Sequence, residues 1–226
     1  MLGVDTRHQA SAVLAAFRYQ LLQSLSAWLS LQADEVLWLE VSEDFSFTTQ
    51  GEDTVVQVKS SARPLTLRSP DVAGALQRFW ARSSAGADQR SRLVFISRGT
   101  AGHEQGFSFP NGQSGLLYWT AAGLDADTGP LREFLTAIFS GEPLGNWLAS
   151  NPNDDELRTK LLRRVVWTLS APDPADLEDG LRERVKIFLR GESLPVSAAD
   201  DAMRMMLQRA FDTACIADPA RRRLTR

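Results

Sequence analysis

Several residue types and patterns are scarce in this 226-residue chain, and each absence excludes a class of protein. A single cysteine, Cys215, rules out an internal disulfide and fits a reducing compartment, so we expect a cytoplasmic protein. With one cysteine and only two distant histidines, His8 and His103, the chain is poorly equipped for a structural zinc site. No apolar run approaches the roughly 18 residues of a membrane span, and the N-terminus lacks the pattern of a secretory signal. We therefore expect no association with a membrane.

Phosphate-binding loops are absent as well, since the sequence contains neither a Walker loop nor a dinucleotide fingerprint. The net charge of −3 argues against a protein that binds nucleic acid through bulk positive charge. It leaves room for an enzyme that gathers cations at one cleft. The length suits one large domain or two small ones with a sizeable core.

The periodicity of apolar residues predicts an α/β arrangement in the first hundred residues. Helical spacing without Pro or Gly predicts a long first helix, and runs rich in β-branched residues predict strands. The expected elements are a helix over 7–32, strands near 35–41, 44–50 and 54–60 with a turn over 50–53, a helix beginning at Pro70, and a strand over 92–97.

The remainder of the chain is mainly helical in pattern and follows a polar, Gly-rich loop over 99–115. The expected elements are a strand over 116–120, helices over 130–140, 144–149 and 154–164, a strand over 164–169, and helices over 176–190 and 197–217. The last residues, 220–226, are basic and have no capping signal, which is consistent with a domain of a longer protein.

Polar side chains in the strand expected at 54–60 carry the main functional signal. Side chains alternate along a strand, so Gln57 and Lys59 point to the same side of a segment that otherwise reads as buried. Asp44 opens the preceding strand. An acid at the start of one strand, followed by Gln-x-Lys on the next, is the minimal layout of a metal-dependent phosphodiesterase.

Cleavage of a phosphodiester develops negative charge, which Mg²⁺ on oxygen ligands neutralises while it lowers the pKa of a bound water. We expect Asp44 to be the principal ligand, with the side-chain carbonyl of Gln57 and the backbone carbonyl of Val58 as further ligands. Lys59 is the expected catalytic cation, placed to orient the water or to stabilise the charged transition state.

Glu40 and Glu43 are candidates of lower rank. In a fully extended chain, Glu40 and Asp44 would lie about 13 Å apart, at roughly 3.3 Å per residue. Both carboxyls can reach one ion only if the chain turns at Ser42–Glu43.

Each of these residues also has a purely structural interpretation. Lys59 fits a strand-end lysine whose charge reaches water, and Gln57 fits a buried amide satisfied by backbone groups. On periodicity alone, Tyr19 packs in the core and Gln20 is solvated. Interspersed acids favour solvated surfaces for the cations of 158–164 and 221–223 over phosphate contacts.

Three segments together resemble a known family: Ala15–Gln20 (AAFRYQ), Glu40–Asp44 (EVSED) and Val56–Ser60 (VQVKS). They are similar to the double-strand DNA nuclease domain of bacterial anti-phage effectors. These include the CBASS and STAND-type antiviral proteins, in the PD-(D/E)XK restriction-endonuclease-like superfamily. The resemblance implies an αβββαβ core over residues 1–120 and leaves 121–226 as a largely helical extension.

The resemblance also implies an activity and a site. It implies Mg²⁺-dependent cleavage of double-stranded DNA with little sequence preference, with Mn²⁺ as a substitute metal. Residue by residue, Asp44, Gln57 and Lys59 match the metal and catalytic positions, Gln20 matches a helix glutamine near the site, and Glu40 matches a preceding acid. The chain departs from the family at Ala16, where glycine is common, and at Gln57, where an acid is typical.

Partners and alternatives follow from the same resemblance. It implies a sensor or NTPase domain in the same longer protein and a homo-oligomer as the active form. Two rival functions stay open: a catalytically degenerate nuclease fold that serves as a DNA-binding or oligomerisation module, and an RNA nuclease with the same site.

Overall fold

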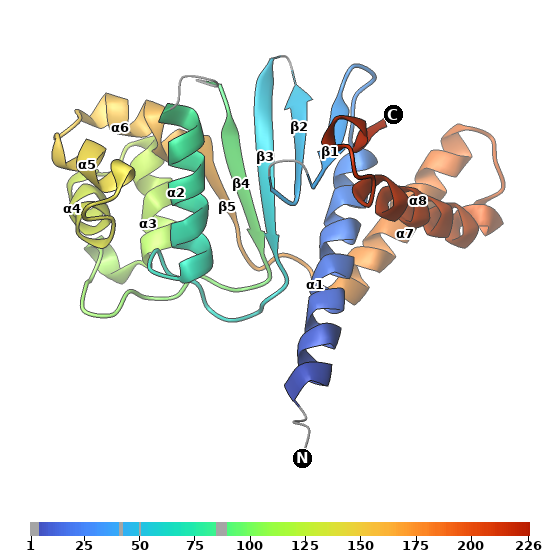
Figure 1. Cartoon of the computed structure of the whole chain (residues 1–226), viewed down its shortest axis with the longest axis horizontal. Helices are drawn as coiled ribbons and strands as arrows, with labels where there is room; N and C mark the ends of the chain where they lie inside the picture. Colours follow the sequence, from blue (N-terminus) through green and yellow to red (C-terminus); the bar gives the residue numbers. More distant parts are fainter. Residues whose placement is uncertain (1–4, 41–42, 50, 85–89) are drawn as a thin grey trace. The chain divides into compact units, whose positions relative to one another are not determined.

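Six strands form one mixed sheet in the computed structural model of the protein (Figure 1). The structure describes residues 5–40, 43–49, 51–84 and 90–226. Strand order in the sheet is β5-β4-β3-β2-β1-β6; β1 runs antiparallel to both β2 and β6, and β4 runs parallel to β5. The strands are β1 Val36–Leu39, β2 Phe45–Thr49, β3 Glu52–Lys59, β4 Arg92–Ser97, β5 Val165–Thr168 and β6 Arg223–Thr225. The α/β class expected from the sequence is confirmed.

Eight α-helices accompany the sheet in the described residues: α1 Asp5–Trp28, α2 Pro70–Ser84, α3 Gly115–Leu124, α4 Gly129–Ile138, α5 Pro143–Ala149, α6 Asp154–Lys160, α7 Pro174–Gly191 and α8 Ala199–Ala214. The first six elements follow the predicted order of helix, three strands, helix and strand. Gln50, in the expected turn before β3, lies outside the described residues, whereas its neighbour Gly51 has a positive φ of 79°. No helix in the described ranges is long and apolar enough to cross a membrane.

The strand predicted over 116–120 is wrong, because these residues lie in α3. The hydroxyl of Ser114 caps this helix by accepting from the backbone N–H of Leu117. Leu116 and Trp119 are both buried, and the indole N–H of Trp119 donates to the carbonyl oxygen of Leu162 at 3.0 Å. A short apolar run fits a buried strand and a buried helix equally well, so periodicity alone could not separate them.

The chain divides into two compact units that interleave along the sequence. The first unit comprises residues 1–50, 58–60 and 171–226, and the second comprises 51–57 and 61–170. The expected division into a core over 1–120 and an extension over 121–226 stays a prediction.

The second unit contains the larger apolar core. Helices α2 and α5 pack together, as do α4 and α5, and α3 packs on β5. Aromatic side chains fill this core: Phe95 and Trp119 both contact the ring of Trp167, and Phe109 and Phe134 lie 5.4 Å apart by their ring centroids.

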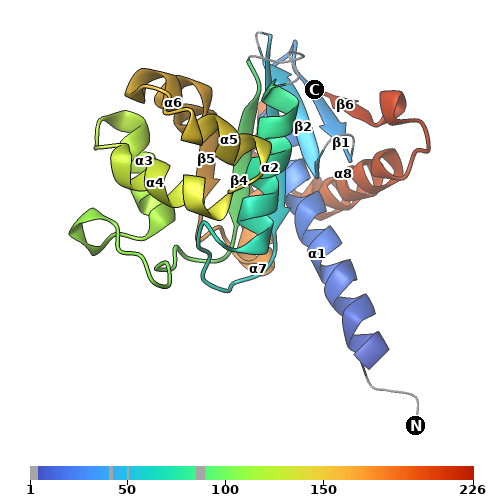
Figure 2. The same ribbon diagram turned by 60° about the vertical axis from the view of Figure 1, so that its left-hand side comes forward.

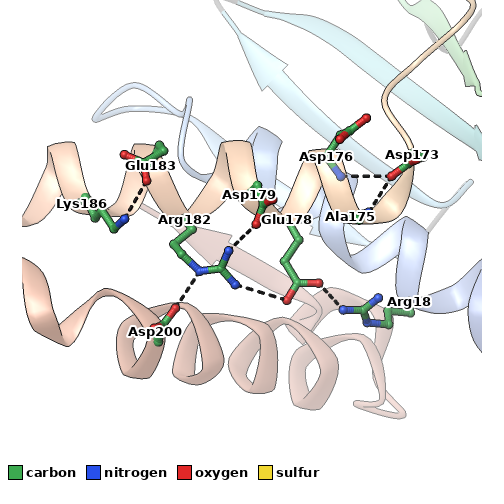
Figure 3. A network of polar contacts seen from close by, with 10 residues as sticks. All are labelled: Arg18, Asp173, Ala175, Asp176, Glu178, Asp179, Arg182, Glu183, Lys186 and Asp200. Carbon is green, nitrogen blue, oxygen red and sulfur yellow. Dashed lines mark hydrogen bonds and ion pairs between the residues drawn. The ribbon is translucent and has the colours of Figure 1, made fainter.

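The first unit is built from α1, α7 and α8 with β1, β2 and β6. Leu22 and Leu25 of α1 pack with Leu181 of α7 and Met203 of α8. Charged side chains join the same helices on the outside: Glu178 pairs with Arg18, and Arg182 bonds to Asp179 and, at 2.7 Å, to Asp200 (Figure 3). Helix α7 starts two residues before the predicted position, where Asp173 accepts from two backbone N–H groups (Figure 3).

The first half of α1 extends beyond α7 and α8 in both views (Figures 1 and 2). Its side chains from Ala10 to Ala15 are exposed, including Val13 at 66% and Leu14 at 68%. The apolar stripe predicted for this helix is therefore buried only from about Tyr19 onward.

Candidate active site

Asp44 belongs to the first unit and is the residue immediately before β2. Each oxygen of its carboxylate accepts one hydrogen bond. Oδ1 accepts from the side-chain Nε2 of Gln20 in α1 at 2.6 Å. Oδ2 accepts from the backbone N–H of Val58 in β3 at 2.5 Å. An ionised carboxylate can accept several hydrogen bonds, and these two fix its orientation between α1 and the end of β3.

Glu40 is brought to Asp44 by a tight turn between β1 and β2. The backbone N–H of Glu40 donates to the carbonyl oxygen of Asp44 at 3.0 Å, and Leu39 lies opposite Phe45 in the antiparallel pair. This bond places the main chain of Glu40 beside that of Asp44, whereas Ser42, one of the two residues at which a turn was expected, lies outside the described residues. Glu40 itself has a φ of 50°, in the left-handed region that residues other than glycine rarely adopt.

The two carboxyl groups are close enough to perturb each other. Burial raises the pKa of the Glu40 carboxyl, and the negative charge of Asp44 raises it further. The guanidinium of Arg222 acts in the opposite direction and lowers it. A divalent cation at this place would favour the ionised form of Glu40 and so offset both effects that raise its pKa.

Arg222 was not predicted to take part, and its interpretation as a solvated charge is wrong. Its guanidinium donates to the carbonyl oxygens of Glu40 and Ile216, each at 2.6 Å. Its own carbonyl oxygen accepts from the backbone N–H of Leu39 at 2.8 Å. Arg222 and Glu40 are 182 positions apart, so no local signal in the sequence could have revealed this contact.

Gln57 belongs to the second unit and is only 5% exposed. Its side-chain carbonyl oxygen, the expected metal ligand, accepts from Nη2 of Arg78 in α2 at 3.1 Å. A carbonyl oxygen has two lone pairs, so one remains after this bond. The positive charge of Arg78 nevertheless makes this oxygen a weaker ligand for a cation.

Lys59 and Val58 end β3 in the first unit, where Lys59 is half-buried. For Val58 the structure shows the N–H bonded to Asp44, so a metal contact through its carbonyl oxygen stays a prediction. Tyr19 is fully buried and donates its hydroxyl to the carbonyl oxygen of Pro172 at 3.0 Å, which confirms its role in the core. Gln20, by contrast, is bonded to Asp44 and is not simply solvated.

The donor set limits which ion could bind. Within 5–40, 43–49, 51–84 and 90–226, no three His, Cys, Asp or Glu side chains cluster as metal ligands. A site built on Glu40 and Asp44 would therefore have fewer than three such side-chain ligands in the described residues. Mg²⁺ is commonly bound through one or two carboxylates with several retained waters, so these residues fit it better than a fully protein-ligated ion.

Comparisons with known proteins give no family for this chain, so its function is argued from the geometry of the site. No protein-family model matches the chain, and no curated protein matches it at a significant level.

Proposed function

We propose that this chain is a metal-dependent DNA endonuclease, the effector domain of a prokaryotic anti-phage defence protein. One observation carries the proposal: the tight turn that presents Glu40 and Asp44 together, with the Asp44 carboxylate fixed by Gln20 and by Val58. Burial and the negative charge of Asp44 both raise the pKa of Glu40, and a bound cation would offset the cost of keeping this carboxyl ionised.

Each residue has a defined part in this proposal. Asp44 and Glu40 hold the ion, and the oxygens of Gln57 and Val58 are its further candidate ligands. The bound Mg²⁺ would supply a water of lowered pKa and positive charge beside the phosphate. Lys59 would stabilise negative charge on the phosphate oxygens, as a compact cation whose stem is half-buried at the end of β3. Gln20 orients the Asp44 carboxylate.

The order of elements supports a restriction-endonuclease-like core as the finer description of the fold. Helix, three strands, helix and strand follow one another from α1 to β4. Asp44 precedes the second strand and Lys59 ends the third, as the resemblance to anti-phage nuclease domains implies. On that resemblance we propose double-stranded DNA as substrate, a homo-oligomer as the active form, and a sensor or NTPase domain in the same longer protein.

A second candidate function is a degenerate nuclease fold that binds DNA or self-associates without cutting. The contact between Arg78 and Gln57 favours it, because a guanidinium occupies the oxygen at the position where the family typically has an acid. This alternative predicts DNA binding or self-association that is indifferent to divalent ions and to Lys59.

Cleavage of linear and plasmid DNA by the purified protein tests the proposal. The assay compares Mg²⁺ with EDTA, at low and high protein concentration, and includes a parallel RNA substrate. Lys59→Ala and Asp44→Ala are the test variants, and Lys186→Ala is the matched control, since this lysine pairs with Glu183 on the surface of α7. We expect DNA cleavage that requires Mg²⁺, Asp44 and Lys59. The Lys186→Ala variant should cut DNA as the wild type does. Full activity in both folded test variants would refute the site, and DNA binding without cutting at any concentration would favour the second candidate.

A further inference from the structure

The turn that carries the acid pair is held from outside by the last strand of the chain. Strand β6 lies antiparallel to β1, with Arg223 opposite Trp38 and Leu224 opposite Leu37. Leu224 is buried, and the carbonyl oxygen of Thr225 accepts from the indole N–H of Trp28 at 2.8 Å. Three kinds of contact therefore hold the three-residue strand β6 in place: main-chain pairing with β1, burial of Leu224, and the hydrogen bond from Trp28.

Arg222 is the residue immediately before β6, and its side chain contacts Glu40, the residue immediately after β1. Its guanidinium bridges two main-chain carbonyl oxygens, those of Glu40 and Ile216, at 2.6 Å each. Such charge-assisted bonds are shorter and stronger than neutral ones. One of the two is made to Glu40, whose backbone is in the left-handed region, a conformation that persists only where its surroundings enforce it.

We propose that Arg222 is a positioning residue for the acid pair, and that the seating of β6 on β1 therefore controls the geometry of the site. Arg222 holds the carbonyl of Glu40, and the N–H of the same residue is bonded to the carbonyl oxygen of Asp44, so Arg222 supports the main-chain contact that brings the two acids together. If β6 separates from β1, the guanidinium is withdrawn and the carbonyl of Glu40 loses this bond. The effect on catalysis rests on the proposed nuclease function, whereas the positioning itself does not.

Hydrogen exchange of two backbone amides reports the positioning without metal or substrate. The N–H of Glu40 is bonded to the Asp44 carbonyl oxygen, and the N–H of Val58 is bonded to the Asp44 carboxylate. We expect Arg222→Met to accelerate exchange at both amides at least tenfold, while amides of β4 in the second unit are unchanged. Arg222→Lys should restore part of the protection, because a lysine can donate to the Glu40 carbonyl without bridging to Ile216.

Arg223→Met is the matched control, since Arg223 is the next residue, carries the same charge and has an exposed side chain. It should leave both amides and any cleavage activity as in the wild type. In the cleavage assay, Arg222→Met should raise the Mg²⁺ concentration for half-maximal activity about tenfold, with a smaller effect at saturating Mg²⁺.

Each result separates the two proposals. Unchanged exchange at Glu40 and Val58 in Arg222→Met would overturn the positioning role, whatever the protein cleaves. Accelerated exchange in a protein that cuts no DNA would support the positioning role and count against the nuclease. Accelerated exchange with unaltered Mg²⁺ dependence would overturn the coupling of β6 to the site. If Arg222→Met does not fold, the partial change expected in Arg222→Lys provides the same test.

Discussion

Asp44 shows how one residue can serve structure and chemistry at once. Its two carboxylate oxygens accept from a side chain of α1 and from the main chain at the end of β3, so it links these two segments of the first unit to the start of β2. Each donor is at least partly shielded from water, and an unmet donor of this kind is costly.

Asp44→Asn should therefore impair both stability and activity. The amide keeps the shape of the side chain but turns one acceptor into a donor, so either Gln20 or Val58 faces an N–H group. We expect a loss of about 1–3 kcal/mol in the free energy of unfolding, measured by urea denaturation, together with loss of DNA cleavage. Asp34→Asn, at an exposed position, is the control. Equal stability of the two variants would show that the bonds to Asp44 are weaker than their geometry indicates.

Glu104 carries a pH dependence that lies outside the candidate site. Burial raises the pKa of its carboxyl, and the hydrogen bond from the backbone N–H of Leu67, at 2.6 Å, only partly opposes this. Because the folded state holds the proton more tightly than the unfolded state, the contribution of Glu104 to stability is complete below its ordinary pKa of 4.5. It is lost as the pH rises through the raised pKa of the folded protein.

Glu104→Gln should remove this dependence, since the amide oxygen can still accept from Leu67 and no charge is buried. We expect the stability of Glu104→Gln relative to wild type to increase as the pH rises from about 4.5 toward neutrality. Urea denaturation at a series of pH values measures the difference, with the exposed Glu133→Gln as control. A difference that is constant with pH would contradict the direction of the shift.

At the scale of elements, α1 behaves as two segments with different energetics. Its second half is buried between α7 and α8, whereas the first half exposes apolar side chains. Sequence periodicity recognised the helix but could not tell which turns have a partner.

Leucines in the two segments should accordingly differ in their response to truncation. Leu25→Ala, at a fully buried position, should reduce the free energy of unfolding by about 2–5 kcal/mol. Leu14→Ala, at a position 68% exposed, should change it by less than about 0.5 kcal/mol. Urea denaturation of both variants at low protein concentration tests the contrast. A comparable loss in Leu14→Ala would mean that the first half of α1 is covered in solution.

At the scale of the whole molecule, metal binding should appear as thermal stabilisation. A ligand that binds only the folded state adds about 2.7 kcal/mol when its concentration is about 100 times its Kd. For a chain of this size that corresponds to a rise in Tm of roughly 5–10 °C. We expect Mg²⁺ to raise the Tm of the wild type, EDTA to reverse the rise, and Asp44→Ala to abolish it. An equal rise in Asp44→Ala would place the ion elsewhere.

Prediction from sequence succeeded where the signal is local. The proline at the start of α2, the β-branched run of β3 and the Pro- and Gly-free stretch of α1 are all local signals, and each element lies close to its expected place. It failed at 116–120, where an apolar run is ambiguous, and it did not anticipate β6 among the basic residues at the end of the chain. An edge strand of three residues has no periodicity to detect.

The sequence by itself determined the α/β class, the order of its first six elements and the candidate residues Asp44, Gln57 and Lys59, because propensity, periodicity and residue type are properties of short segments. Only the tertiary structure decided which groups meet. Gln20 with Asp44, Arg78 with Gln57 and Arg222 with Glu40 are separated by 24, 21 and 182 residues. Contacts across such distances depend on packing of whole elements, which no local pattern encodes.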